Sequence, residues 1–89
     1  MMSEEMICEN NILEYNCKYY LIKPLNGMDV KYGIKIDKYN KDNKLVDSKC
    51  IPNIFDSKEK MIKGIRILNK LQVTPITLED VVIDNIYSR

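Results

Sequence analysis

Histidine and tryptophan are both missing from this 89-residue sequence. Histidine is the commonest general base and metal ligand, and it is the usual activating partner of a serine or cysteine nucleophile. The sequence also lacks a glycine-rich phosphate-binding loop and a lysine followed by serine or threonine, as found in P-loops. These absences argue against catalysis. We therefore expect a protein that is not an enzyme and has no catalytic residue, no cofactor and no bound metal.

Cysteine is scarce. Cys8, Cys17 and Cys50 are odd in number and form no Cys-x-x-Cys pair. This pattern argues against a disulfide framework and a zinc knuckle, and it fits reduced thiols in a reducing compartment. Cys17 and Cys50 fall on the core faces of the strands predicted below, so we expect both to pack as small hydrophobic side chains.

Long hydrophobic runs are missing as well. Apolar stretches such as Val81-Val82-Ile83 are only a few residues long, whereas a membrane-spanning helix needs about 20. The first residues, MMSEEMICENN, are acidic where a signal peptide would be basic. We expect a cytoplasmic protein with no membrane segment.

What remains is the composition of one ordinary globular domain, with 45% hydrophobic and 30% charged residues. The chain is long enough for a single small core. We expect one α+β domain over residues 12–89, with residues 1–11 forming either a flexible end or an extra strand.

The pair Asn26-Gly27 predicts a β-hairpin, because it supplies the two positive φ angles of a type I′ turn. With these two residues as the loop, the paired core positions are Leu21 with Tyr32, Tyr19 with Ile34, and Cys17 with Ile36. The other face is expected to be largely solvated, with Gly33 opposite Tyr20.

The cluster YNKDN at 39–43 predicts a second turn, and KLVDSKCI predicts a third strand after it. We expect Val46 and Cys50 to join the apolar face of the sheet.

Two helices follow. Asp56 and Glu59 resemble a capping box before a helix whose apolar face holds Met61, Ile62, Ile65, Leu68 and Leu71. The second helix begins either at Thr74, with Pro75 in the first helical position, or at Thr77. Under either start we interpret its acids as a helix start and a solvated face rather than an active site; they are Glu79, Asp80 and Asp84.

The predicted fold class is therefore α+β, a three-stranded antiparallel meander followed by two helices packed on one face (β-β-β-α-α).

A basic surface is one candidate for function. The net charge is only +1, but lysines concentrate in the middle of the chain between two acidic ends. The first candidate interaction surface lies on the side of the sheet away from the helices and comprises Lys18, Tyr20, Ile22, Lys31, Lys35 and Lys49. Lysines beside an aromatic ring on a sheet are typical of some single-stranded nucleic-acid binders. The alternative is that these lysines only solubilise the sheet, and a near-neutral chain favours it.

A second candidate surface is the basic stripe Lys63, Arg66 and Lys70 on the first helix, and a solvated helix face is the favoured explanation of this stripe. The side of the sheet away from the helices also suits a protein partner or a second copy of the chain, unless the N-terminal segment covers it.

Two motifs carry a resemblance to a known family. The strand YGIKI at 32–36 and the helix VTPITLEDVVID at 73–84 resemble a small uncharacterised family of spore-forming Gram-positive bacteria, a domain of unknown function. Its pattern is a Tyr-Gly-Ile-x-Ile strand and a Thr-Pro-x-x-Leu-x-Asp-Val helix. The resemblance covers roughly residues 19–87 and implies one cytoplasmic domain with no catalytic residues.

From these observations we expect a small regulatory or adaptor module that acts without catalysis, by binding another protein or a second copy of itself. The alternative is a nucleic-acid-associated accessory factor that uses the lysine and tyrosine face of the sheet.

Overall fold

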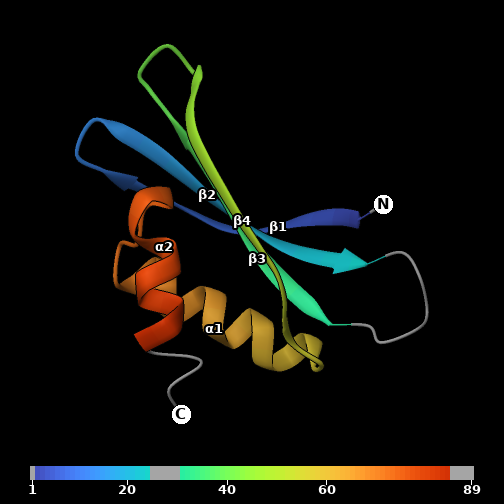
Figure 1. The fold of residues 1–89 in the computed structure, drawn as a ribbon. Coiled ribbons are helices and arrows are strands. Elements are labelled where there is room, and N and C mark those ends of the chain that lie inside the picture. The colour runs from blue at the N-terminus through green and yellow to red at the C-terminus, as the bar shows by residue number, and fades with distance from the viewer. Residues whose placement is uncertain (1, 25–30, 85–89) are drawn as a thin grey trace.

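The computed structural model describes residues 2–24 and 31–84 and has an α+β fold (Figure 1). Four strands precede two helices, in the order β1 (Met2–Ile12), β2 (Tyr15–Pro24), β3 (Tyr32–Tyr39), β4 (Leu45–Phe55), α1 (Lys58–Lys70) and α2 (Pro75–Val82). The strands form one antiparallel sheet in the spatial order β1-β2-β3-β4. The predicted α+β class is confirmed, but the prediction of three strands is wrong.

The additional strand is β1, the extra-strand alternative for the N-terminal residues. It pairs with β2 along its length, and the register shifts between Met6 and Cys8. This β-bulge places one more residue in β1 than in the facing part of β2, so the alternation of apolar and polar residues breaks there. The Asn10 side-chain amide also donates to the Asn69 carbonyl at the end of α1 (3.1 Å).

Both helices lie on the same face of the sheet, as predicted, while the tips of the two hairpins extend beyond them (Figure 1). Helix α1 contacts all four strands, and α2 contacts β3 and β4. Inward-facing side chains of β2, β3 and the helices make the core, whose most fully buried members include Cys17, Tyr19, Leu21, Ile34, Ile36, Met61, Ile65, Leu68, Leu78 and Val82.

The register of β2 and β3 differs from the predicted one by two residues. Leu21 pairs with Ile34, Tyr19 with Ile36 and Cys17 with Lys38. A shift of two residues keeps every side chain on its predicted face, so the apolar pattern could not distinguish the two registers. The predicted Asn26-Gly27 turn lies outside the described residues.

Gly33 faces Ile22 on β2, and the prediction that it lies opposite Tyr20 is wrong. A Cβ added at Gly33 would lie 2.4 Å from the Ile51 carbonyl oxygen and 2.6 Å from the Cα of Pro52. Glycine is therefore needed for the close approach of β4, whose register with β3 shifts at this point.

Cys50 lies on the face without helices, and the prediction that it joins the core is wrong. It pairs with Lys35 and is exposed, and Val46 is 49% exposed beside a second irregularity of β4. The core side of β4 is supplied instead by Ile51 and by Ile54, which follows the irregularity near Asn53.

The first helix begins one residue later than predicted. Ser57, and not Asp56, is the N-cap of α1, and its hydroxyl accepts a hydrogen bond from the Lys60 N–H (3.3 Å). At the other end Leu71 is the C-cap, and it is 56% exposed. The prediction that Leu71 belongs to the buried apolar face of the helix is therefore wrong. Helix α2 uses the first of the two predicted starts, with Thr74 as N-cap and Pro75 as its first residue.

Candidate interaction surface

The face of the sheet opposite the helices brings together three of the six candidate residues of the first set, Lys18, Tyr20 and Lys35. Cross-strand pairing places them in two rows that run across all four strands. We name these rows the open-face patch; they are Met6, Tyr20, Lys35 and Cys50, and beside them Glu9, Lys18, Asp37 and Ser48.

Lys35 is the centre of the patch. Its Nζ lies 2.6 Å from the Glu4 Oε2, 3.5 Å from the Asp37 Oδ2 and 5.0 Å from the centroid of the Tyr20 ring. Burial acts to lower the pKa of Lys35, but the hydrogen bond to Glu4 and the charges of Asp37 and Glu4 outweigh it and raise the pKa. The Lys35 charge is thus already matched by acids of the same chain.

Asp37 is the most buried charged side chain of the patch, at 6% exposure. The Ser48 hydroxyl donates to its Oδ1 (2.5 Å), and Lys35 approaches its other oxygen. A buried carboxylate is stable only when it is paired and hydrogen-bonded, and Asp37 meets both conditions. Its role is to fix Lys35 and Ser48 in place.

Aromatic rings accompany the lysines. The Lys18 Nζ lies 4.9 Å from the centroid of the Tyr39 ring, a cation–π geometry. Burial raises the pKa of Tyr20, and the nearby Tyr39 and Asp37 raise it further. The Tyr20 phenol is therefore neutral at physiological pH and serves as hydrogen-bonding, partly apolar surface.

Strand β1 lies beside β2 as the edge of the sheet and does not lie across this face. The ion pair between Glu4 and Lys35 connects side chains of β1 and β3 across β2. The expected alternative, that the N-terminal segment covers the sheet, is therefore not what β1 does: it extends the sheet. At the β1 end of one row, Met6 stays 50% exposed.

The charge of the patch is not basic. With Glu4, it contains three carboxylates against the two ammonium groups of Lys18 and Lys35. Binding to nucleic acid depends on several unmatched positive charges that neutralise phosphates. This arrangement gives little attraction for a polyanion.

The other candidates of the first set lie outside the patch. Ile22 is on the same face of the sheet, but it is buried, at 2% exposure, and cannot contact a partner. Lys31 is exposed just before β3. Lys49 pairs with Ile36 on the helix-bearing face, where its Nζ lies 3.3 Å from the Glu79 Oε2. The expected grouping of Lys49 with Lys35 therefore does not occur.

Sequence reasoning missed Met6, Glu4 and Glu9 as parts of this surface, because it did not assign β1. The sequence did contain a signal, because the charge of the acidic N-terminal stretch is opposite to that of the lysine-rich middle of the chain. Only the pairing of β1 with β2 brings these acids and lysines together.

The second candidate set lies together on α1. Lys63, Arg66 and Lys70 are exposed, and the first two line a hollow of about 460 Å³ with Ser57, Glu59, Lys60 and Ile62. The hollow contains both acidic and basic side chains, which is typical of a solvated helix surface.

Arg66 also acts on Cys8, which is not part of this hollow. Burial raises the pKa of Cys8, while the charge of Arg66 and a hydrogen bond with Asn69 act to lower it.

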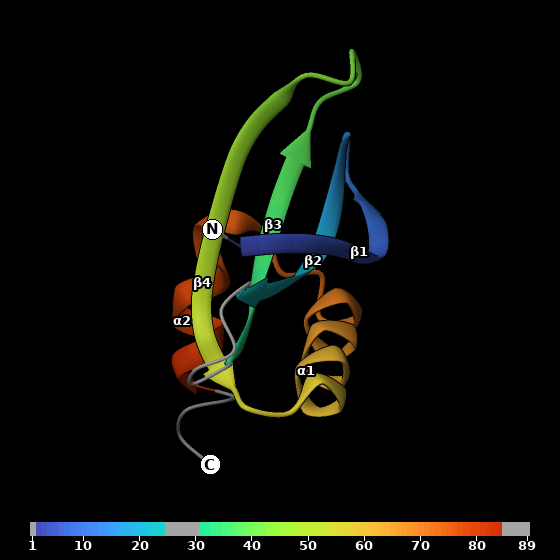
Figure 2. The same cartoon turned by 90° about the vertical axis from the view of Figure 1, so that its right-hand side faces the viewer.

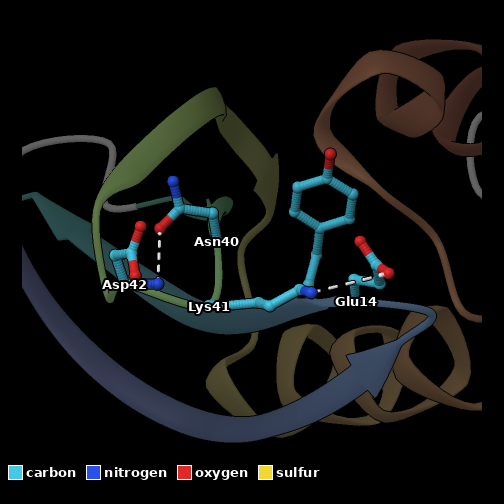
Figure 3. A pocket seen from close by; sticks show the side chains of 5 residues that line it. Glu14, Asn40, Lys41 and Asp42 are labelled. Atoms are coloured by element: carbon cyan, nitrogen blue, oxygen red, sulfur yellow. Dashed lines mark hydrogen bonds and ion pairs between the residues drawn. The ribbon is translucent and has the colours of Figure 1, made fainter.

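A second pocket, of about 350 Å³, lies where the β1–β2 turn meets the β3–β4 turn (Figure 3). The Lys41 Nζ lies 3.8 Å from the Glu14 Oε1, and both side chains are more than 70% exposed. The Asn40 Oδ1 accepts a hydrogen bond from the Asp42 N–H (2.9 Å), which shapes the turn. Contacts within the chain therefore account for the positions of these polar side chains, and no ligand is needed to explain them.

Thiol and metal chemistry gain no support from the geometry. Burial raises the pKa of the Cys8 and Cys17 thiols, which lowers the share of reactive thiolate. Within residues 2–24 and 31–84, no group of three or more potential ligand side chains is arranged to hold a metal ion. In the same part of the chain, no helix combines the length and apolar character needed to cross a membrane.

Comparison with known proteins identifies a family. The model of a family of unknown function, DUF6514, matches residues 1–88. No match was found among curated proteins or among solved structures.

Proposed function

Because the chain belongs to the DUF6514 family, whose function is unknown, we propose a function from its geometry: a small regulatory or adaptor module that acts without catalysis, by binding another protein through the open-face patch. The observation that carries this proposal is the internal matching of Lys35 by Glu4 and Asp37. It leaves a surface of tyrosine, methionine and paired charges rather than a basic one. Tyrosine and methionine are enriched at protein interfaces, and lysine is depleted.

We place the protein in the cytoplasm of spore-forming Gram-positive bacteria, with the strand at 32–36 and the helix at 73–84 as the marks of its family. The cytoplasmic part of this proposal is supported by three cysteines that are free in the structure, as suits a reducing compartment.

The test is affinity capture of the tagged chain from its native cells, at low and high salt, with and without nuclease. Met6→Asp introduces a charge at an exposed apolar position of the patch, on β1. Ile67→Asp is the matched control, since Ile67 is 52% exposed on α1, outside the patch. We expect a protein partner that survives salt and nuclease, is lost with Met6→Asp and is retained with Ile67→Asp.

Other outcomes contradict the proposal in different ways. Equal capture by Met6→Asp and the unsubstituted chain would remove the open-face patch as the binding surface. Partners that disappear with nuclease or high salt, with nucleic acid recovered from the untreated sample, would favour the accessory factor of nucleic acid instead, because phosphate contacts weaken steeply with salt.

A further inference from the structure

Strand β4 forms one edge of the sheet, and no strand of the described residues pairs with its outer side (Figure 2). Residues 45–50 are all exposed. Between its two irregularities β4 pairs with β3 in an unbroken register, from Asp47 with Lys38 to Ile51 with Ile34. A regular, exposed edge strand is a template for pairing with another strand.

In a single copy of the chain, the backbone N–H of Ser48 on this edge has a hydrogen-bond acceptor within β4 itself. It donates to the Oδ1 of its own neighbour, Asp47 (2.8 Å). An added strand would offer a backbone carbonyl in place of that carboxylate, and the Asp47 side chain would then be available for a cation.

The charges on β4 select one register for a second copy. Antiparallel pairing with Ser48 opposite Ser48 of the partner subunit places Asp47 opposite the partner's Lys49, and Lys49 opposite the partner's Asp47. Opposite charges across an antiparallel pair are stabilising and like charges are destabilising. The neighbouring registers that keep the same face place Asp47 against Asp47 of the partner subunit, or Lys49 against the partner's Lys49.

The flanking residues agree with this register. It places Val46, which is 49% exposed and lies in the irregularity between Leu45 and Asp47, opposite the exposed Cys50 of the partner subunit, so two exposed apolar side chains become neighbours. It also ends before Pro52, which has no N–H to donate to a ladder.

The arrangement keeps the helices of both copies on one side of a continuous sheet, because paired residues point to the same face. There, Ile51, Val82 and Ile83 line a hollow of about 270 Å³ together with Lys49 and Glu79. The contact between Lys49 and Glu79 is largely exposed, and an ammonium group has three donors, so Lys49 can bond Glu79 and the partner's Asp47 together.

We infer that β4 is the self-association surface of this protein, and that a second copy of the chain pairs with it in an antiparallel manner about Ser48. The inference rests on the proposed function in one respect, because it names a second copy of the chain as one partner of the proposed binding module. It uses the edge of the sheet and not Met6 or Tyr20.

Crosslinking tests the register directly. Residues directly opposite in an antiparallel pair have Cα atoms about 4.5–5.5 Å apart, within the range of about 4.4–6.8 Å for a disulfide. With Cys50→Ser in the background, Ser48→Cys should give a covalent dimer under mild oxidation. Glu59→Cys, at an exposed position of α1, is the control and should not. Equal crosslinking by both variants, or none by Ser48→Cys, would overturn the inference.

A charge exchange tests the partner contacts. Sedimentation should show a dimer for the unsubstituted chain. Asp47→Lys or Lys49→Asp should each raise the dissociation constant of the dimer about tenfold or more, because two pairs of opposite charge become two pairs of like charge. The combination of both substitutions should restore the dimer. An unsubstituted chain that stays monomeric, or a combination no better than the single variants, would overturn the inference.

The two proposals fail separately. Met6→Asp should leave the dimer intact, and a monomeric chain that still loses its captured partner with Met6→Asp would retain the proposed function and reject the dimer. A monomeric chain that loses a different protein with Asp47→Lys would make β4 a strand-addition site for that protein, and this too would overturn self-pairing.

Discussion

At the scale of single residues, Tyr19 shows how one polar atom connects the sheet to the helical layer. Its ring is fully buried in the core, and its hydroxyl donates to the Val73 carbonyl between α1 and α2 (2.6 Å). That carbonyl has left the regular pattern of the helix and needs a donor inside the protein. Tyr19 therefore fixes the position of the second helix relative to β2.

Tyr19→Phe should lower the free energy of unfolding by about 1–3 kcal/mol, because it leaves a buried carbonyl without a partner while the ring packing remains. Urea denaturation measures this change. Tyr15→Phe is the matched control: Tyr15 lies under the Lys38 ammonium (4.1 Å to the ring centroid), a contact that needs only the ring. Equal stability of Tyr19→Phe and the unsubstituted protein would contradict this role.

At the scale of elements, the start of α1 shows where a sequence motif and the actual cap differ. Asp56 and Glu59 satisfy the capping pattern, but the chain enters the helix at Ser57, whose backbone is extended (φ −108°, ψ 125°). Both residues are good N-caps, so local preference alone could not choose between them. The choice depends on where β4 ends and on which face of α1 reaches the core.

Ser57→Ala should reduce stability by about 1 kcal/mol, because the Lys60 N–H loses its acceptor. Asp56→Ala should have a much smaller effect. The two variants can be compared by thermal denaturation followed by circular dichroism. A larger loss for Asp56→Ala would show that the capping box predicted from sequence is the one that operates.

At the scale of the whole molecule, the described residues divide into a helix-bearing side and an open side that carries matched charges. Buried groups link this arrangement to pH. Burial raises the pKa of Cys17 above its ordinary value of 9.0, and burial together with the charges of Cys17 and Cys8 raises that of Tyr19 above its ordinary value of 10.0. The folded chain therefore holds these protons at pH values where the unfolded chain releases them.

Stability should consequently fall at alkaline pH. A raised pKa contributes stability that is fully present below the unfolded value and is lost as pH rises above it, by up to about 1.4 kcal/mol per pH unit for each buried group. Loss should begin near pH 9 with Cys17 and steepen near pH 10 with Tyr19. Urea denaturation from pH 7 to pH 11 tests this, and Tyr19→Phe should flatten the upper part of the curve. A constant free energy of unfolding across that range would contradict the assignment.

The sequence by itself determined the class of the fold, the burial faces of β2 and β3, the apolar face of α1 and one of two starts for α2, because local periodicity and capping chemistry act over a few residues. It also brought Lys18, Tyr20 and Lys35 to one surface, since alternation along a strand needs no distant partner. The tertiary structure decided what depends on neighbours: the bulged strand β1, the two-residue shift of the hairpin, the outward position of Cys50 and the separation of Lys49 from Lys35. It also decided the charge of the candidate surface, because Glu4 and Lys35 lie far apart in the sequence and meet only when β1 pairs with β2 at the edge of the sheet. Register and strand order are set by the free energy of the whole sheet, and no local pattern contains that quantity.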